Sequence, residues 1–247
     1  MTQQLLDTEQ IPAPNIDHLV LEDDTPVDNF QSAQQQRLLV ETLYGSKVLP
    51  SPFLADANVG LFYKLKGDPI VPDVLLSLGV SHPGNYAQKQ NRSYLTWEIG
   101  KLPEVCIEIV SNQEGDELTL SRKSQQKGKS VSKKDLYAQI GIPYYVVFDP
   151  LQQIQEPDQM NGELLKVFAL TERHYRELSS PFWMEDVGLG LTLWEGEFEE
   201  VSGVWLRWCD QNGQVILSGA EGREAERQRA NRLAERLREL GINPDEV

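Results

Sequence analysis

Two short apolar runs, each interrupted by one acidic residue, are the clearest feature in the pattern of hydrophobic and polar positions. Residues 70–76 read Ile-Val-Pro-Asp-Val-Leu-Leu, and residues 105–110 read Val-Cys-Ile-Glu-Ile-Val. Runs of this length and β-branched content predict strands that are covered on both faces. Each predicted strand therefore holds one carboxylate, Asp73 or Glu108, in apolar surroundings.

The segment after the second run predicts a long connection, a helix and another buried strand. Residues 111–132 are polar and longer than a compact domain usually needs for one connection. Ser132 is a suitable N-cap for a helix over residues 132–140, and Gly141 is a suitable stop. The apolar residues 144–148 predict the next strand.

The rest of the chain predicts further elements around this centre. Residues 30–44 predict a helix that ends at Gly45. Residues 59–63 and 70–78 predict a hairpin that presents Asp73 near the centre of the sheet. Later segments predict a loop over 81–92, a second hairpin over 164–170 and 175–178, and extra β structure packed on the core over the tryptophan-rich residues 181–217.

Residues 220–240 are rich in Ala, Glu, Arg and Leu and predict a helix. Its apolar residues recur at spacings of three and four positions, as in a coiled-coil seam: Ala230, Leu233, Leu237 and Leu240. The seam is shorter than the roughly three to four heptads that define a coiled coil. We expect this helix either to pack on its own domain or to pair with another subunit.

Length and composition limit the class of protein. The 247 residues are enough for one sizeable core with appendages or for two small domains, and 40% hydrophobic with 25% charged residues is typical of a soluble globular protein. No apolar run approaches the roughly 20 residues of a membrane span, and the first ten residues lack a signal-peptide pattern. Two cysteines cannot form a disulfide framework. We expect a cytoplasmic protein that does not bind a membrane.

The net charge of −15 argues against general binding of nucleic acid, because phosphate binding draws on lysine and arginine. Residues 121–134 depart from this acidity, since they contain six basic residues and no acid. The segment either attracts a phosphate backbone locally or is a solvated loop. The candidates for binding nucleic acid in it are Arg122, Lys123, Lys127 and Lys129.

The two embedded acids predict a site for a hard cation. A buried, ionised carboxylate costs several kcal/mol unless it is paired, neutralised or bound to a cation. Mg²⁺ is held by one or two carboxylates together with waters and substrate phosphates, and Mn²⁺ is the alternative ion. A lysine would complete such a site by polarising water or holding the phosphate. The alternative for Glu108 is a place near the strand end and a salt bridge to a neighbour.

Four motifs follow one another along the chain: Pro72-Asp73, Glu108-Ile109-Val110-Ser111, Lys133 to Tyr137, and Gly141 to Pro150. Together they resemble the Uma2 family, also called DUF820, of the PD-(D/E)XK nuclease superfamily. Residues 189–196, 205–208 and 237–244 are similar to the extension of the longer cyanobacterial members. The resemblance therefore covers roughly residues 30–247.

This resemblance implies an α/β (α+β) fold with a restriction-endonuclease-like core. A mixed central β-sheet would be flanked by helices, with added C-terminal β structure and a terminal helix. Asp73 and Glu108 would be the two metal-binding acids. The superfamily's usual lysine would stand two residues after the second acid, where this chain has Val110.

Many members of the family look as though this lysine has moved to the following helix, four residues before a tyrosine. That spacing selects Lys133 and Tyr137, because residues four apart share a helix face. Lys134 is the second choice, and two solvated lysines at a helix start are the alternative. Since some members of the superfamily use an acid from the first helix, Glu41 is a further candidate.

Together these features predict four segments and one activity. The segments are a loosely ordered acidic tail (1–28), a nuclease-like core (29–180), a tryptophan-rich β extension (181–217) and a C-terminal helix (218–247). The activity is Mg²⁺-dependent hydrolysis of DNA, by a homodimer if both strands are cut, since one site cuts one strand. The alternative is a catalytically silent module that keeps the nuclease fold for binding or assembly.

Overall fold

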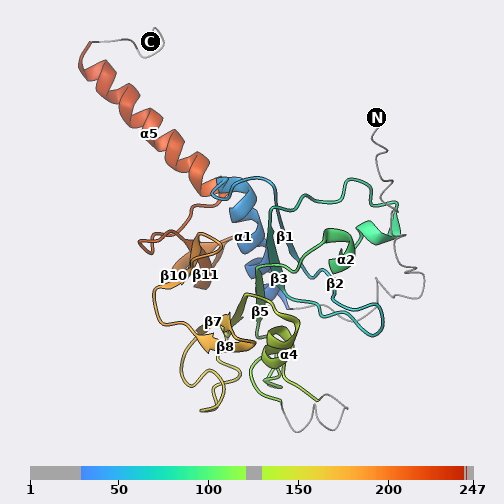
Figure 1. The fold of residues 1–247 in the computed structure, drawn as a ribbon. Coiled ribbons are helices and arrows are strands. Elements are labelled where there is room, and N and C mark those ends of the chain that lie inside the picture. Colours follow the sequence, from blue (N-terminus) through green and yellow to red (C-terminus); the bar gives the residue numbers. More distant parts are fainter. Residues whose placement is uncertain (1–28, 121–129, 242, 244–247) are drawn as a thin grey trace, which may run out of the picture.

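The computed structural model describes residues 29–120, 130–241 and 243 (Figure 1). Two predictions fall outside these residues. One is the N-terminal tail, and the other is the group of candidates for binding nucleic acid, Arg122, Lys123, Lys127 and Lys129.

A six-stranded mixed sheet forms the centre of the fold. Its strands are β1 (Phe53–Ala57), β3 (Val74–Leu78), β5 (Val105–Ile109), β6 (Tyr144–Phe148), β7 (Leu165–Thr171) and β8 (His174–Glu177), in that order. Only β5 and β6 are parallel neighbours, and the other adjacent pairs are antiparallel. The mixed sheet, the further antiparallel sheet and the terminal helix confirm the predicted fold class.

Helices cover both faces of this sheet. Alternate residues of a strand point to opposite faces, so Ile107 packs with α1 (Phe30–Ser46) on one face, whereas Cys106 packs on the other face with Tyr137 of α4 (Lys133–Ile140). Both β5 and β6 are buried along their whole length. The face that carries Glu108 is therefore the face covered by α4.

A second, antiparallel sheet packs beside α1. It consists of β9 (Phe182–Met184), β10 (Leu189–Phe198) and β11 (Val201–Cys209), in the order β11-β10-β9. The indole N–H of Trp208 donates to the carbonyl of Leu39 at 2.9 Å, and the Gln35 side chain pairs with both backbone groups of Leu206. Trp205 and Trp208 are fully buried, so both contribute to packing.

The predicted first hairpin is wrong. Residues 61–62 form β2 (Leu61–Phe62), which pairs in parallel with β4 (Tyr94–Leu95) in a separate small sheet, and only one bridge joins Leu61 to Ile70. The antiparallel partner of β3 on this side is β1. The sequence of β1, Phe-Leu-Ala-Asp-Ala, has three residues that are depleted in strands, which is why it gave no strand signal.

Two short helices between β2 and β5 were not predicted either: η1 (Lys89–Asn91) and α2 (Thr96–Ile99). A helix of one turn gives no hydrophobic periodicity, because periodicity needs a window of about eleven residues or more.

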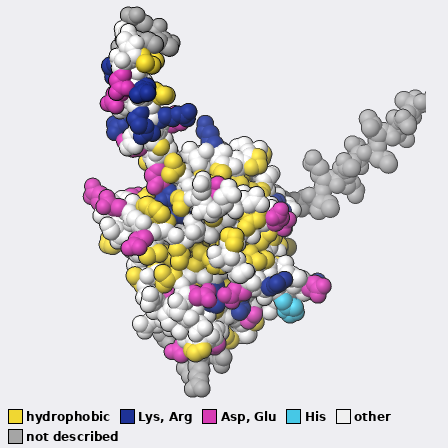
Figure 2. Space-filling model, turned by 90° about the vertical axis from the view of Figure 1, so that its left-hand side faces the viewer, with side chains coloured by type: hydrophobic (Ala, Val, Ile, Leu, Met, Phe, Trp, Pro, Cys, Tyr) yellow, Lys and Arg dark blue, Asp and Glu magenta, His cyan; other side chains and the backbone are white. Residues whose placement is uncertain are grey.

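The last helix, α5 (Gly219–Glu239), extends away from the body of the protein (Figures 1 and 2). Ser218 and Glu221 form a capping box at its first turn. Beyond that turn, Leu233 is 58% exposed and Leu240 is 66% exposed. The seam predicted on this helix is thus uncovered by any described part of the chain. No helix in the described ranges is both long and apolar enough to cross a bilayer.

Candidate active site

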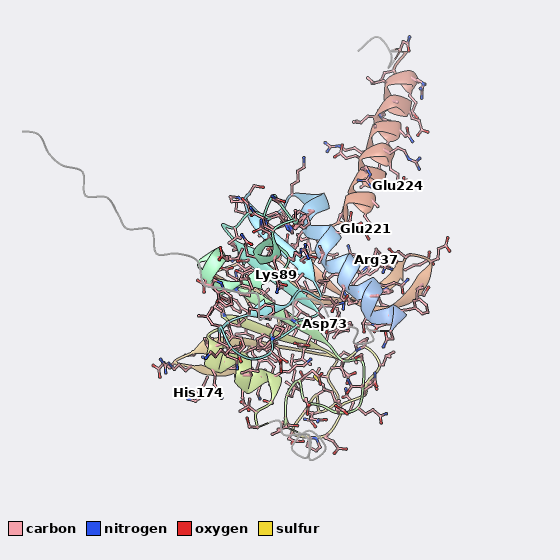
Figure 3. The ribbon with its side chains drawn as sticks, turned by 90° about the vertical axis from the view of Figure 1, so that its right-hand side faces the viewer. Arg37, Asp73, Lys89, His174, Glu221 and Glu224 are labelled. Atoms are coloured by element: carbon pink, nitrogen blue, oxygen red, sulfur yellow. The ribbon has the colours of Figure 1, made fainter. Side chains whose placement is uncertain are left out.

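The two predicted acids lie on neighbouring strands of the central sheet. Asp73 directly precedes β3, whose antiparallel register with β5 pairs Val74 with Ile107. Asp73 precedes that pair by one residue, and its carboxylate reaches the Ile109 amide at the end of β5. Their exposed fractions are only 8% for Asp73 and 1% for Glu108. Figure 3 labels Asp73 between α1 and the sheet.

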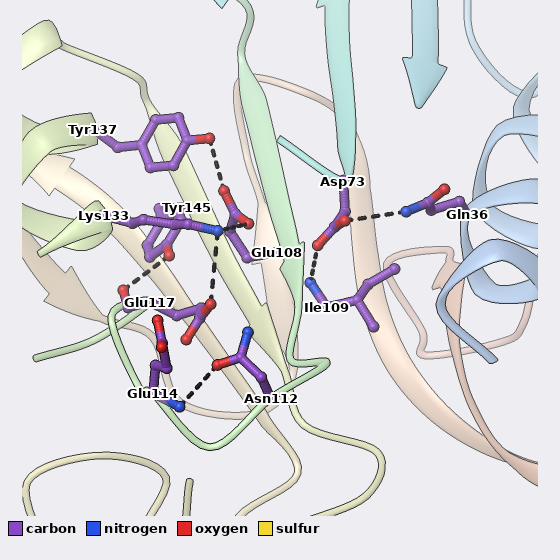
Figure 4. Close-up of polar contacts among 10 residues, drawn as sticks. All are labelled: Gln36, Asp73, Glu108, Ile109, Asn112, Glu114, Glu117, Lys133, Tyr137 and Tyr145. Carbon is purple, nitrogen blue, oxygen red and sulfur yellow. Dashed lines mark hydrogen bonds and ion pairs between the residues drawn. The ribbon is translucent and has the colours of Figure 1, made fainter. Parts of the chain in front are cut away.

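The carboxylate of Asp73 is held between α1 and the backbone of β5 (Figure 4). Its Oδ1 accepts a hydrogen bond from Gln36 Nε2 at 3.0 Å, and its Oδ2 accepts one from the Ile109 amide at 2.5 Å. Gln36 Oε1 in turn accepts from Asn58 Nδ2 at 2.9 Å. These bonds fix the orientation of the carboxylate.

The carboxylate of Glu108 is held by two residues of α4. Lys133 Nζ lies 2.7 Å from Oε2, and the Tyr137 hydroxyl donates to Oε1 at 2.8 Å. Both residues reach the same carboxylate because a four-residue spacing puts them on one face of the helix. Figure 4 draws this group on one side of β5, and Asp73 with Gln36 on the other.

The structure separates the two candidate lysines. Lys133 contacts Glu108, whereas the ammonium of Lys134 lies over the ring of Phe168, 5.3 Å from its centroid. Ser132 begins the helix as predicted, since its hydroxyl accepts from the Asp135 amide at 3.1 Å.

Val110 directly follows β5 and is fully buried. It lies in the same cluster as Cys106, Tyr137 and Tyr145, on the face of the sheet that α4 covers. The ammonium of Lys133 approaches Glu108 from this same face.

Burial and charge set the protonation of this pair. Burial raises the pKa of Glu108 above its ordinary value, although Lys133 and the Tyr137 hydroxyl both favour the ionised form. Burial alone would lower the pKa of Lys133, but attraction to Glu108 and Glu117 outweighs it and raises that pKa. Lys133 is therefore a cation at neutral pH and cannot act as a general base there. With 35% of its side chain exposed, it is also reachable from solvent.

Two residues of this group gave no signal in the sequence. One is Gln36, a polar residue on a helix that is buried because it faces the end of β1 and Asp73. The other is Glu117, from the connection after β5, whose Oε1 lies 3.6 Å from Lys133 Nζ. The features of the sequence that could be recognised were the two apolar runs with one embedded acid each and the four-residue spacing of Lys133 and Tyr137.

Glu41 is not part of this group. Its Oε1 accepts a hydrogen bond from the Gly219 amide at 3.0 Å, so the side chain faces the start of α5. A groove of about 680 Å³ lies nearby between α1, the end of β1 and the β10–β11 turn. Because Gln36 lines this groove and also binds Asp73, solvent reaches within one side chain of the candidate site.

The donor atoms suit a hard cation. Within the described ranges no three His, Cys, Asp or Glu side chains are arranged to hold a metal ion. Mg²⁺ needs only one or two protein carboxylates, since waters and phosphates complete its shell. Asp73 and Glu108 supply such oxygens, and the buried Oε2 of Glu117 has no hydrogen-bond partner among the described residues. These residues fit a divalent cation held by oxygen ligands.

Comparison with protein families identifies the group of proteins. The family model of Uma2, described as "Putative restriction endonuclease", matches residues 20–193, more than half of the chain. The chain belongs to the Uma2 family. The match includes every residue of the site described above and ends within β10, so β11 and α5 lie beyond it. A comparison with curated proteins finds no match.

Membership in Uma2 confirms the predicted resemblance and indicates a nuclease. The similarity of residues 205–208 and 237–244 to longer members lies outside the matched range and stays a prediction.

Proposed function

We propose that this chain is a divalent-cation-dependent endonuclease that hydrolyses phosphodiester bonds in DNA. The observation that carries the proposal is the buried Glu108, contacted by a lysine from α4 and placed on the strand whose Ile109 amide binds Asp73. An ionised carboxylate this deeply buried needs an opposite charge close by. Lys133 supplies one, and a bound divalent cation would supply another. The description of the matching family, which names restriction endonucleases, is the second support.

In this proposal Asp73 and Glu108 hold Mg²⁺, or Mn²⁺ in its place. When bound, the cation would polarise the phosphoryl oxygen and lower the pKa of an attacking water. The Ile109 amide and Gln36 would keep Asp73 oriented, and Tyr137 would do the same for Glu108.

Lys133 would act through its charge. As a cation at neutral pH it can neutralise the negative charge that develops on the phosphate, and its partial exposure allows a phosphate to approach. Contact with substrate would require its ammonium to leave Glu108 in part, and the cation would replace it there.

Two further parts of the proposal concern DNA and assembly. The basic segment 121–134 would attract the backbone, because the rest of the chain is strongly acidic. A homodimer would bring two sites together for double-strand cleavage, and the uncovered seam of α5 is one surface on which two copies could meet.

The second candidate is a catalytically silent module that keeps the fold for binding or assembly. One observation favours it: the ammonium of Lys133 already bridges two carboxylates, Glu108 and Glu117. A lysine locked in this way would hold the core together without acting on a substrate.

Cleavage of plasmid DNA in Mg²⁺ or Mn²⁺ separates these candidates. Wild-type protein should nick or linearise the plasmid, and a chelator should abolish this. Asp73→Asn, Glu108→Gln and Lys133→Met should each lower the rate by about 100-fold or more, whereas Lys66→Met, at an exposed lysine outside the basic segment, serves as the matched control and should keep it. Equal residual cleavage by wild type and all variants would indicate a contaminant and support the silent module.

A further inference from the structure

A small pocket lies between β1 and the loop that follows β3. It has a volume of about 140 Å³ and is lined by residues of β1, of the loop over 82–93 and of α2. Pockets for drug-sized ligands measure roughly 300–1,000 Å³. The space is therefore suited to one flat ring system and is too small for a larger ligand.

The walls of this pocket are largely apolar and aromatic. Leu54, Val59 and Tyr94 line it and belong to one hydrophobic cluster. Tyr86, which is 59% exposed, adds a second aromatic ring from the loop. Surfaces of this kind stack on the flat face of a nucleobase, whichever base it is.

Asp56 is the acid among the described residues that line the pocket. Its Oδ1 accepts a hydrogen bond from the Ala57 amide at 2.9 Å, which holds the carboxylate at the end of β1. Arg92 also lines the pocket, but its guanidinium donates to the carbonyls of Tyr86, at 3.0 Å, and Ala87, at 3.5 Å, and so holds the loop. A carboxylate repels a phosphate, whereas it accepts a hydrogen bond from the amino group of cytosine. The chemistry of the pocket therefore favours a base over the DNA backbone.

The pocket lies on the same face of the central sheet as Glu108. Asp56 pairs with Leu75 of β3, and Leu75 pairs with Cys106 of β5. Leu54 and Cys106 belong to the cluster on the face covered by α4, and residues two apart in a strand share a face, so Asp56 and Glu108 also point to it. Strand spacing and rise put these two acids roughly 10 Å apart across the sheet and about 7 Å apart along it. A DNA strand at Glu108 can therefore reach the pocket with the base of a neighbouring nucleotide.

We propose that this pocket takes one unpaired base of the DNA substrate, with the amino group of that base donating to the carboxylate of Asp56. The inference rests on the proposed function, because it names a contact to the same substrate beside the same site. A base leaves a duplex at an energetic cost, which is least where the base is already unpaired. The pocket would thus select substrates with an unpaired base close to the cleaved bond.

Fluorescence anisotropy of two labelled single strands, with a chelator present to prevent cleavage, tests this inference. One is a ten-nucleotide oligo-deoxycytidine, and the other has the same backbone without bases. Full-length wild type should bind the first about tenfold more tightly, because stacking and the amino contact need a base. Asp56→Asn should reduce this ratio by about fivefold, and Val59→Phe, which fills the pocket, should bring it close to one.

Matched controls make the same changes elsewhere on the surface. They are Asp68→Asn, at an exposed aspartate, and Val201→Phe, at an exposed valine of β11. Both should keep the ratio of wild type, and all four variants should bind the abasic strand as wild type does. Thermal unfolding establishes that each variant is folded at the temperature of the titration. If Val59→Phe does not fold, the isosteric Asp56→Asn decides alone.

The outcomes separate the two proposals. If wild type binds both strands equally, or if a folded pocket variant keeps the ratio of wild type, the base pocket is overturned and the proposed function stands. If wild type binds neither strand and no DNA duplex, both this inference and DNA as the substrate of the proposed function fall.

Discussion

At the scale of single residues, the site depends on polar groups that the fold forces into apolar surroundings. Asp73 and Glu108 could be predicted because an acid inside a short apolar run breaks the pattern. Lys133 could be chosen over Lys134 from its spacing to Tyr137. Gln36 and Glu117 could not be predicted, because a glutamine on a helix and a glutamate in a connection are ordinarily solvated. Their burial arises only from contacts between distant segments.

The hydroxyl of Tyr137 should contribute to stability through Glu108. Tyr137→Phe removes one donor to a buried carboxylate, and such a bond to a charged group is worth about 2 kcal/mol. Urea denaturation should show a free energy of unfolding lower by about that amount. Tyr86→Phe, at an exposed tyrosine, is the control and should change it by less than about 0.5 kcal/mol. Equal stability of the two variants would contradict this role of the hydroxyl.

At the scale of elements, local signals and long-range pairing differ in how well they could be predicted. The buried strands β5 and β6, the helix α4 with its Ser132 cap, and the β7–β8 hairpin all follow from periodicity and from start and stop residues. Strand β1 could not be predicted, because its alanines and aspartate resemble no strand and become one only by pairing with β3. The wrong first hairpin follows from that omission.

The junction between α1 and α5 should depend on a glycine. A Cβ added at Gly45 would lie 2.7 Å from the Gly219 nitrogen and 2.8 Å from its Cα. Gly45→Ala should therefore lower the free energy of unfolding by about 1–3 kcal/mol through overpacking. Gly222→Ala is the matched control, because a Cβ there meets nothing within 4 Å, and it should stabilise α5 by up to about 1 kcal/mol.

Thermal or urea denaturation of both glycine variants measures the difference. If Gly45→Ala is stabilising to the same extent as Gly222→Ala, then α1 and α5 do not approach each other as closely as described.

The start of α5 should also have a characteristic pH dependence. Burial alone would raise the pKa of Glu221, but hydrogen bonds from Arg207 and the Ser218 amide outweigh it and lower that pKa below 4.5, its ordinary value. The stabilisation by ionised Glu221 is therefore complete above pH 4.5, the pKa of this carboxyl in the unfolded chain. It is lost as the pH falls through the lower pKa of Glu221 in the folded protein. Arg207 is fully buried, so losing its partner is costly.

Glu221→Gln should lower the free energy of unfolding by about 1–2 kcal/mol at pH 7, an amount moderated by the partial exposure of Glu221. The difference in free energy of unfolding between wild type and Glu221→Gln should become smaller as the pH is lowered below 4.5. Glu224→Gln, one turn further along α5 (Figure 3), affects an exposed pair with Arg227 and should have little effect at any pH. A gap that stays constant with pH would contradict the assigned role of Glu221.

At the scale of the whole molecule, the proposed binding of DNA depends on the charge of one segment of the sequence. The chain carries a net charge of −15, whereas residues 121–134 hold six basic residues and no acid. Binding of DNA by such a protein should fall steeply with salt, because each neutralised phosphate releases counterions.

Replacement of Lys127 and Lys129 by glutamate should weaken binding to a DNA duplex and reduce the slope of log affinity against log salt by about two. Fluorescence anisotropy at several salt concentrations measures both quantities. The matched control is replacement of Arg229 and Arg232, two exposed arginines of α5, by glutamate. If that change weakens binding as much, the attraction comes from overall charge and not from the basic segment.

A calorimetric titration with Mg²⁺ tests most directly whether Asp73 and Glu108 form one cation site. Wild type should bind Mg²⁺, alone or with a short DNA duplex present, and both Asp73→Asn and Glu108→Gln should lose that binding while staying folded. Lys134→Met should bind as wild type does. If wild type binds no Mg²⁺ even with DNA present, or if either acid can be replaced without loss, the two-carboxylate site is contradicted and the silent module becomes the better account.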